Sequence, residues 1–273
     1  MTQSNNVINI DNLTIEVGGK TLLSNVALAV KPKEQVAIIG ANGAGKTTLL
    51  KALTAMVPPT SGSVEVLGVQ LTGQNSPGEL RHLRGRIGQV FQGLHLVGRL
   101  SAIENVLIGA LGRNASLLTY ARVFSAHERE LAQSTLEAVG MGHAAQFRVD
   151  RLSGGERQKV AVARALNQNP ELILADEPTA NLDPSAAEDI ANLLARLTTE
   201  RQITLVTVAH TMKLLPNLAQ RVVGLKSGRI FFDKPLDAID AGEIKQLFRR
   251  ESEDSLPAYS TRSRDSKSYS AWQ

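Results

Sequence analysis

The sequence predicts an α/β fold built around a parallel β-sheet, and three short, mainly apolar segments lead to that prediction. Residues 35–39, 171–175 and 203–208 each form a run typical of a strand that is buried on both faces. An amphipathic helical pattern near residues 185–198 separates the second run from the third. Because strands that alternate with helices usually pair in parallel and carry the helices on the faces of the sheet, we expect an α/β domain.

The composition is that of an ordinary globular protein. Of the 273 residues, 42% are hydrophobic and 21% are charged, so the chain is long enough for a large core and is not of the disordered class. The net charge of +4 fits a nucleotide or an anionic membrane surface, but it is too small to indicate nucleic-acid binding. There is no cysteine, which excludes a disulfide framework and a cysteine-ligated metal site.

Membrane insertion is not expected of the chain itself. Residues 1–6 lack the basic and apolar regions of a signal peptide. No apolar run approaches the roughly 18 residues that span a bilayer. We therefore expect the chain to lie in the cytosol and to reach a membrane only through a partner.

The N-terminal part of the chain is expected to form an antiparallel β subdomain. Hydrophobic residues alternate in residues 7–10 and 13–17, and Gly18-Gly19 follows, which predicts a β-hairpin whose turn is supplied by the glycines. Residues 63–66 and 85–91 also have strand patterns. The first third of the chain is therefore predicted to be mainly β.

A helical subdomain is expected to be inserted in the α/β core. Residues 100–149 are rich in leucine and alanine and have a helical pattern, and we place the inserted subdomain at about residues 93–160 of a domain that covers residues 1–250. Residues 251–273 are dominated by serine, charged residues and turn formers. We expect a mobile polar tail there, with docking of its three isolated aromatic residues as the alternative.

A glycine-rich loop directly follows the strand predicted at residues 35–39. Its sequence is Gly40-Ala41-Asn42-Gly43-Ala44-Gly45-Lys46-Thr47-Thr48. Glycines let successive backbone N–H groups point into one concave space, where they bind phosphate oxygens at a helix N-terminus. Lys46 adds a positive charge for the β- and γ-phosphates, and the Thr47 hydroxyl is a hard-oxygen ligand for Mg²⁺. Strand, loop and the helical pattern of residues 48–53 together predict a P-loop that binds a nucleoside triphosphate.

Two acidic residues stand at the end of the second buried strand. Asp176 and Glu177 follow residues 172–175, and the carboxyl end of a strand in an open α/β sheet is where ligands bind. Asp176 is expected to hold Mg²⁺ through its water shell. Glu177 is expected to orient and polarise the water that attacks the γ-phosphate, because this reaction needs positioning more than covalent help.

A second anion-binding motif lies between these two. Ser153-Gly154-Gly155-Glu156 opens a helical pattern, and a Ser-Gly-Gly turn at a helix N-terminus presents backbone N–H groups to an anion. One nucleotide does not need two such sites from the same chain. The residues by themselves thus predict two separate anion-binding helix ends in one chain.

At this point the sequence resembles the ABC transporter ATPases. The P-loop, the Leu-Ser-Gly-Gly motif at residues 152–155, the acidic strand end with Glu177-Pro178, the segment 181–183 and His210 occur in the order of that family, and the similarity covers about residues 7 to 235. The resemblance implies a P-loop NTPase core and ATP hydrolysis. It also implies that two copies of the subunit face each other head to tail, so that residues 153–156 meet the ATP held by the partner.

The resemblance assigns roles to individual residues. Gln92 matches the glutamine that touches Mg²⁺ and the attacking water, Asp183 matches a loop that crosses the dimer interface, and His210 matches the histidine that contacts the γ-phosphate. The implied catalytic residues are Lys46, Glu177 and His210. The implied ATP-binding residues are Val17, Gly40 to Thr48 and Gln92, and the implied Mg²⁺ ligands are Thr47, Gln92 and Asp176.

Two positions depart from the pattern of the family. An aromatic residue that stacks on adenine is usual near position 17, where this chain has Val17. Apolar contact is weaker than aromatic stacking by about 1 kcal/mol, so we expect a looser hold on the base than on the phosphates. The last residue of the Ser-Gly-Gly motif is Glu156 instead of the commoner glutamine, a variation that the family tolerates.

Three less general segments are similar to the ATPases of phosphonate and phosphite importers. They are residues 91–101, 104–112 and 221–230. This resemblance implies ATP-driven closure of a dimer that powers an importer for phosphonate or a related phosphorus oxyanion. The implied partners are a second copy of the chain, transmembrane permease subunits and, indirectly, a solute-binding protein, at the cytoplasmic face of the cell membrane. Nucleic acid is not an expected partner.

Two alternatives remain at this stage. The first is the ATPase of a related importer, for phosphate or an amino acid. The second is a soluble ABC ATPase, for which a phosphonate-degradation complex is the remaining candidate, because the chain has neither the long coiled coils of repair ATPases nor a second ATPase cassette. Glu177→Gln is expected to keep ATP binding and abolish turnover, and Lys46→Ala to lose binding.

Overall fold

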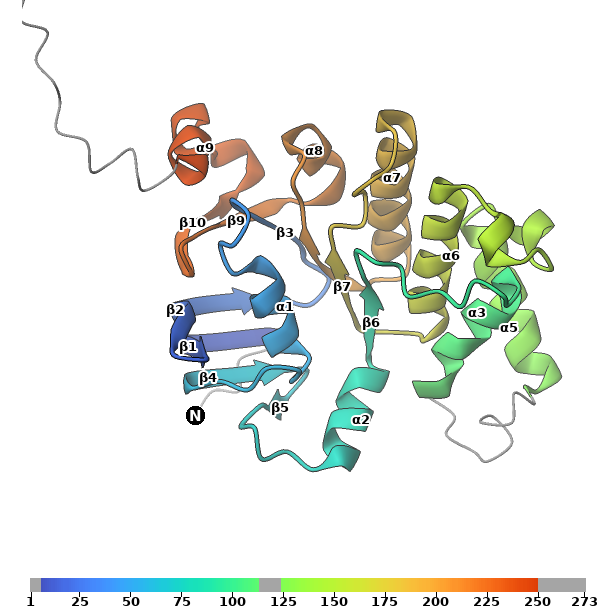
Figure 1. Cartoon of the computed structure of the whole chain (residues 1–273), viewed down its shortest axis with the longest axis horizontal. Helices are drawn as coiled ribbons and strands as arrows, with labels where there is room; N and C mark the ends of the chain where they lie inside the picture. Colours follow the sequence, from blue (N-terminus) through green and yellow to red (C-terminus); the bar gives the residue numbers. More distant parts are fainter. Residues whose placement is uncertain (1–5, 113–123, 250–273) are drawn as a thin grey trace, which may run out of the picture.

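The computed structural model describes residues 6–112 and 124–249, so the tail predicted at residues 251–273 lies outside the described residues. Two β-sheets lie side by side, with helices packed against them and a group of helices at one end (Figure 1). The larger sheet is mostly parallel and the smaller one is antiparallel. The predicted α/β class with an antiparallel subdomain and added helices is confirmed.

The larger sheet has six strands in the order β10-β9-β3-β8-β7-β6. Their bounds are β3 Gln35–Ile39, β6 Ile87–Val90, β7 Leu172–Asp176, β8 Thr204–Val208, β9 Arg221–Lys226 and β10 Arg229–Pro235. All neighbouring pairs are parallel except β9 and β10. β3 and β8 are buried along their whole length, as continuous apolar runs predict. The strands β9 and β10 are additions that the sequence analysis did not place.

The smaller sheet has the order β2-β1-β4-β5. Its strands are β1 Ile8–Val17, β2 Lys20–Val30, β4 Ser61–Val66 and β5 Val69–Gln70. Val17 pairs with Lys20 across a two-residue turn in which Gly18 and Gly19 have φ of 59° and 75°. Positive φ at both central residues is what a tight hairpin turn needs, so the predicted glycine turn is present.

The helices surround these sheets. Their bounds are α1 Lys46–Leu53, α2 Pro77–Gly85, α3 Ala102–Ile108, α5 Ala126–Ala138, α6 Gly154–Asn167, α7 Pro184–Glu200, α8 Leu215–Leu218 and α9 Ala241–Phe248. Short 3-10 helices cover Gly109–Gly112, Gly142–Ala144, Val149–Arg151, Met212–Leu214 and Leu236–Ala238. α3, α5 and α6 pack against one another and form the helical group beyond β6 (Figure 1). No helix in residues 6–112 or 124–249 is long and apolar enough to cross a membrane.

α7 shows why the helices settle on the sheet. Ile190, Leu194 and Leu197 recur at helical spacing and are at most 2% exposed. Asp183 precedes the helix as its N-cap and accepts a hydrogen bond from the Ala186 N–H at 3.0 Å. The apolar stripe and the cap therefore fix both the orientation and the start of α7, next to the strand end that carries the acidic pair.

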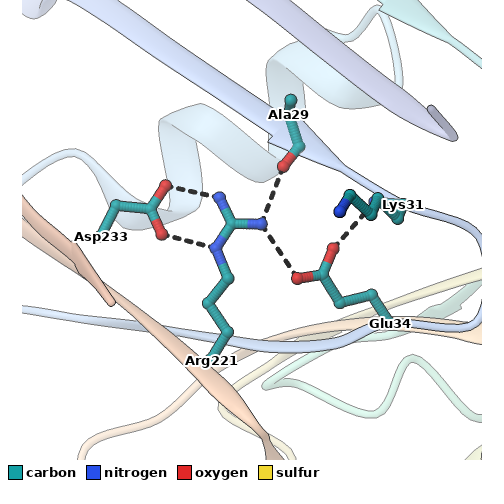
Figure 2. Close-up of polar contacts among 5 residues, drawn as sticks. All are labelled: Ala29, Lys31, Glu34, Arg221 and Asp233. Atoms are coloured by element: carbon teal, nitrogen blue, oxygen red, sulfur yellow. Dashed lines mark hydrogen bonds and ion pairs between the residues drawn. The ribbon is translucent and has the colours of Figure 1, made fainter. Parts of the chain in front are cut away.

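Arg221 joins the two sheets (Figure 2). Its guanidinium binds Asp233 of β10 with distances of 2.5 and 2.6 Å, and one further nitrogen donates to Glu34 and to the Ala29 carbonyl at 2.9 Å each. The other Glu34 oxygen accepts from the Lys31 N–H at 2.8 Å. These carboxylates raise the pKa of Arg221 further above its usual value. The cluster fixes the turn that leads from β2 into β3 and hence into the glycine-rich loop.

Candidate nucleotide-binding site

The loop between β3 and α1 has no room for side chains at two of its glycines. A Cβ on Gly40 would lie 2.1 Å from the Leu225 carbonyl oxygen, and one on Gly45 would lie 2.7 Å from the Leu23 side chain. Gly45 also has φ of 105°, a value that residues with a Cβ rarely adopt. Strands β2 and β9 therefore pack directly against the loop, which curves tightly over the N-terminus of α1. This is the arrangement that a phosphate site requires.

Lys46 is held at the base of this arch. Its side chain is 6% exposed, and Nζ donates hydrogen bonds to the carbonyls of Gly40 at 2.8 Å and Ala41 at 3.0 Å. Burial lowers the pKa of Lys46, while the charges of Glu177 and Asp176 raise it. An incoming phosphate would supply the anionic partner that the ammonium lacks, since its described hydrogen bonds go to neutral carbonyls.

A cavity of about 980 Å³ opens over the loop. It is lined by Lys20, Thr21, Leu22, Asn42, Gly43, Gly45, Lys46, Thr47, Thr48, Gln92, Glu177, His210, Ser227 and Gly228. Most of the predicted ATP-binding residues thus lie around one space. The sequence analysis missed the contributions of Lys20 to Leu22 at the start of β2 and of the β9–β10 turn. No sequence motif marks them, because only the sheet arrangement brings them to the loop.

Val17 lies at the end of β1 and is 53% exposed. It is not among the described residues that line the cavity, whereas its cross-strand neighbour Lys20 is. Val17 therefore stands exposed next to the cavity and outside its lining.

The two acidic residues at the end of β7 face different partners. Asp176 Oδ1 lies 3.5 Å from the Thr47 hydroxyl oxygen, at the N-terminus of α1. Burial is the main cause that raises the pKa of Asp176, and the neighbouring charge of Glu177 adds to it. A nearby cation would relieve both effects, so this pair of oxygens is suited to a hard metal ion that arrives with a nucleotide.

Glu177 has both of its carboxylate oxygens engaged. Oε1 lies 2.5 Å from His210 Nε2, and Oε2 accepts a hydrogen bond from Gln92 Nε2 at 3.1 Å. Gln92 follows β6, Glu177 follows β7 and His210 follows β8, and these three strands are neighbours in the sheet. Parallel pairing therefore brings residues that are far apart in the sequence to one edge. Glu177 has φ of 50°, which turns its side chain out of the strand direction.

The Ser-Gly-Gly motif begins α6 at a different place. Ser153 is the N-cap: its hydroxyl accepts from the Glu156 N–H at 3.3 Å, and the Glu156 carboxylate accepts from the Ser153 N–H at 2.8 Å. This reciprocal capping box uses the carboxylate that replaces the commoner glutamine. Residues 153–156 are not among the described residues that line the cavity. A chain by itself therefore keeps its two anion-binding helix ends apart.

Comparison with known proteins agrees with this geometry. The sequence profile described as ABC transporter matches residues 23–180. The chain belongs to the ABC transporter family. It is accordingly an ATP-binding cassette with ATPase activity, and the resemblance seen in the sequence motifs is confirmed.

Curated relatives cover almost the whole chain. A "Phosphonates import ATP-binding protein PhnC 1" of Ruegeria sp. (strain TM1040) is 41% identical over 89% of this chain and 94% of its own length. A "Phosphonates import ATP-binding protein PhnC" of Stutzerimonas stutzeri is 40% identical over 96% of both chains. A "Phosphate-import ATP-binding protein PhnC" of Mycolicibacterium smegmatis (strain ATCC 700084 / mc(2)155) is 42% identical over 88% of this chain and 90% of its own.

Solved structures with the same fold include two cassettes. The dimeric post-hydrolysis state of MJ0796, bound to ADP and Pi, has a TM-score of 0.73 and 33% identity and covers 85% of this ABC ATPase and 100% of that chain. CbiO1 from Clostridium perfringens, part of an ABC transporter complex, has a TM-score of 0.77 and 26% identity, with 89% and 94% coverage.

Proposed function

We propose that this ABC ATPase powers an importer for phosphonate or a related phosphorus oxyanion. The observation that supports this most is the similarity over nearly the full length to phosphonate import ATP-binding proteins from several bacteria. With 96% of the chain covered, the similarity extends well beyond the motifs shared by all such ATPases. Phosphate is the second candidate solute, because the relative in Mycolicibacterium smegmatis is named for phosphate import.

Mg²⁺ accompanies ATP in the proposed reaction. Thr47 and Asp176 offer two hard oxygens 3.5 Å apart, and Gln92 lines the cavity over the glycine loop together with Thr47. In the described residues no group of three or more His, Cys, Asp or Glu side chains could hold a metal by itself. This fits Mg²⁺, which is commonly held by one or two protein oxygens together with the phosphates of its nucleotide. When bound, the ion neutralises charge on the β- and γ-phosphate oxygens.

The residues around the proposed γ-phosphate position have different roles in ATP hydrolysis. Lys46 binds phosphate oxygens, as its position at the base of the glycine loop allows. Glu177 orients the attacking water, and His210, 2.5 Å from it, holds the carboxylate and contacts the γ-phosphate. Gln92, 3.1 Å from the same carboxylate, would help to position the water and would stand near the metal ion when one is bound. The groups need only position and polarise the reactants, which supplies most of the catalysis in phosphoryl transfer.

A second copy of the chain completes the site. Ser153 to Glu156 stand at an exposed helix N-terminus away from the chain's own cavity, and Asp183 caps the neighbouring helix α7. Gly154 lies 3.6 Å from Leu182 when a Cβ is added, so the two helix ends are packed together. In the proposed head-to-tail dimer these ends meet the ATP in the partner's P-loop. The MJ0796 relative is a dimer bound to ADP and Pi.

The permease is proposed to dock on a groove between the core and the helical group. Two adjoining hollows of about 230 and 460 Å³ share Arg84, Ile108, Gly109 and Gln168. Phe91 and His95, from the loop that follows β6, line the first hollow. Phe91, His95, Ile108 and Gly109 come from the segments that resemble phosphonate-importer ATPases. Docking there places the chain at the cytoplasmic face of the membrane, with a solute-binding protein acting from the other side.

The proposed function is tested in the assembled complex. ATP hydrolysis is measured after the ATPase, its permease and the binding protein are reconstituted in liposomes, with methylphosphonate, phosphite, phosphate or an amino acid added in turn. We expect phosphonate or phosphite to stimulate hydrolysis most. Stimulation by phosphate or an amino acid alone would assign the related importer. A chain that co-purifies with no permease from detergent-solubilised membranes would overturn the importer function and favour a soluble ATPase.

A further inference from the structure

Arg164 is hydrogen-bonded to the loop that carries Gln92. It lies on α6, and its guanidinium donates two hydrogen bonds, to the carbonyl of His95 at 2.6 Å and to the carbonyl of Leu94 at 2.7 Å. The acceptors belong to successive residues, so the planar fork of an arginine matches them as a pair. A helix of the outer group thereby holds the loop at the edge of the catalytic site.

This loop, residues 91–95, has a backbone conformation that two of its residues do not favour. Leu94 and His95 have φ of 57° and 48°, the left-handed region that glycine adopts easily and that other residues avoid. The Leu94 N–H donates to Phe91 O at 3.0 Å, and the His95 ring meets the Phe91 ring edge-on at 4.7 Å between centroids. Two successive strained residues persist only where their surroundings hold them, and Arg164 supplies two short hydrogen bonds to them from another element.

The position of Arg164 is itself fixed from the other side. A Cβ on Gly109 would lie 2.2 Å from the Arg164 carbonyl oxygen, so the end of α3 packs directly on the backbone of α6 there. The described hydrogen bonds of the guanidinium go to neutral carbonyls, and burial lowers the pKa of Arg164. A partly buried charge whose described partners are neutral carbonyls contributes little to stability. The position of the Arg164 guanidinium is better explained by the loop that it holds at Leu94 and His95.

The loop leads directly to the catalytic carboxylate. Gln92 stands two residues before Leu94, and its side-chain amide contacts Glu177 at 3.1 Å. Backbone hydrogen bonds from Leu94 to Phe91 and from His95 to Gly93 close the turns at residues 91–95. A shift of the anchored end of this short loop is therefore transmitted to Gln92. The contacts thus run from α6 through Arg164 and the loop to Glu177.

We propose that Arg164 is a positioning residue for ATP hydrolysis, which fixes the loop at Leu94 and His95 and so sets the approach of Gln92 to Glu177. The proposal rests on the roles proposed above for Gln92 and Glu177. It links the two ends of one helix: Ser153, the N-cap of α6, belongs to the motif proposed to meet a partner's nucleotide, and Arg164 near the other end holds the loop of its own site. Arg164 also lines the groove assigned to the permease.

Arg164→Lys tests the grip in the full-length chain with Mg-ATP. A lysine keeps the charge but has a single ammonium on a flexible stem, so it does not hold two carbonyls in a fixed fork. We expect kcat to fall about ten- to a hundredfold, the range for a catalytic group displaced by about 1 Å. The Kd for ATP should stay unchanged, because the glycine loop is untouched. An unchanged kcat would overturn the proposal.

A double-mutant cycle with Gln92→Ala tests whether Arg164 acts through Gln92. If it does, adding Arg164→Lys to the Gln92→Ala variant lowers kcat little further. If the two losses multiply, the proposal is wrong while the role of Gln92 stands. If Gln92→Ala by itself leaves kcat unchanged, the proposed role of Gln92 fails and the proposal fails with it.

Arg86→Lys is the matched control. Arg86 also makes several guanidinium hydrogen bonds, to the Glu171 carboxylate and the Leu67 carbonyl, but it lies at the opposite end of β6 from Gln92. It should lower the melting temperature and leave kcat unchanged. An equal loss of kcat in this control would mean general loosening and would overturn the proposal. Should Arg164→Lys not fold, Arg164→Gln removes the buried charge and is measured in the same assays.

Discussion

The side chains of Glu177 and His210 meet at 2.5 Å, from Oε1 to Nε2, at the ends of the adjacent strands β7 and β8. Gln92 contacts the second carboxylate oxygen at 3.1 Å. A water that attacks a phosphate needs one of these two oxygens as its acceptor. We therefore expect ATP binding to rearrange the contacts of the Glu177 carboxylate.

Glu177→Gln should separate binding from hydrolysis. The amide keeps the size of the side chain and can still hydrogen-bond His210, but it is too weak a base to polarise water. We expect ATP binding to be retained and steady-state turnover to fall by about a hundredfold or more, with the dimer trapped in the presence of ATP. Phosphate release and size-exclusion chromatography measure the two effects. Normal turnover would remove Glu177 from its role, and Glu171→Gln, at the other end of β7, is the control.

Lys46→Ala should instead abolish nucleotide binding. The ammonium is the positive charge at the base of the glycine loop, and its hydrogen bonds of 2.8 and 3.0 Å to loop carbonyls show that it reaches the phosphate position. Loss of a charge-assisted contact to phosphate weakens binding by about 2 kcal/mol or more. A fluorescent ATP analogue measures the affinity. Lys51→Ala, an exposed change on the same helix, should bind normally, and equal binding by both variants would contradict the assignment.

Asp176→Asn should stabilise the nucleotide-free protein while it impairs hydrolysis. The pKa of Asp176 is raised, chiefly by burial, so its surroundings disfavour the charged form. A raised folded-state pKa gives a stabilisation that is present below the ordinary pKa of the carboxyl and lost as the pH rises through the folded value. Asparagine does not ionise and has no such loss. The free energy of unfolding of the variant should therefore exceed that of the parent chain by about 1 kcal/mol or less at neutral pH, and the difference should vanish near pH 3. Thermal unfolding at both pH values measures it; a lower melting temperature at pH 7 would contradict it.

Glu156→Gln should change the acid stability of α6 and leave hydrolysis intact. Hydrogen bonds from Ser153 lower the pKa of Glu156. A lowered pKa gives a stabilisation that is present above the ordinary pKa and lost as the pH falls through the folded value. Glutamine accepts the same bond at every pH. The variant should therefore lose less stability than the parent chain between pH 6 and pH 3.5 in thermal unfolding, and an identical loss would show that the cap does not titrate.

Arg221→Ala should loosen the junction of the two sheets (Figure 2). The substitution leaves Asp233 and Glu34 beside each other without their cation, in a partly buried setting. We expect a loss of about 2 kcal/mol in the free energy of unfolding, less than for a fully buried pair. Urea denaturation measures it. The exposed Arg229→Ala on β10 is the control, and equal stabilities of the two variants would show that the cluster contributes little.

Much of the core was predictable because local patterns and the tertiary fold agree. The strand predicted at residues 35–39 is β3 with the same bounds, and the helix predicted at residues 185–198 is part of α7. Continuous apolar runs have no alternative to burial on both faces, so such strands are marked by their composition. The strand β10 and the helix α9 escaped prediction because they are largely exposed and have weak patterns, and the buried run of β9 is interrupted by Gly224.

The sequence by itself determined the chemistry of this protein: the order of the P-loop, the Ser-Gly-Gly motif, the acidic pair and the histidine specifies an ABC ATPase. Only the tertiary structure decided how these groups meet. Parallel pairing of β6, β7 and β8 places Gln92, Glu177 and His210 within hydrogen-bond distance at one edge. The hydrogen bonds from Arg164 to the loop could not be predicted from the sequence either. A backbone carbonyl can accept a hydrogen bond whatever its residue type, so only the path of the chain shows which carbonyls lie near Arg164.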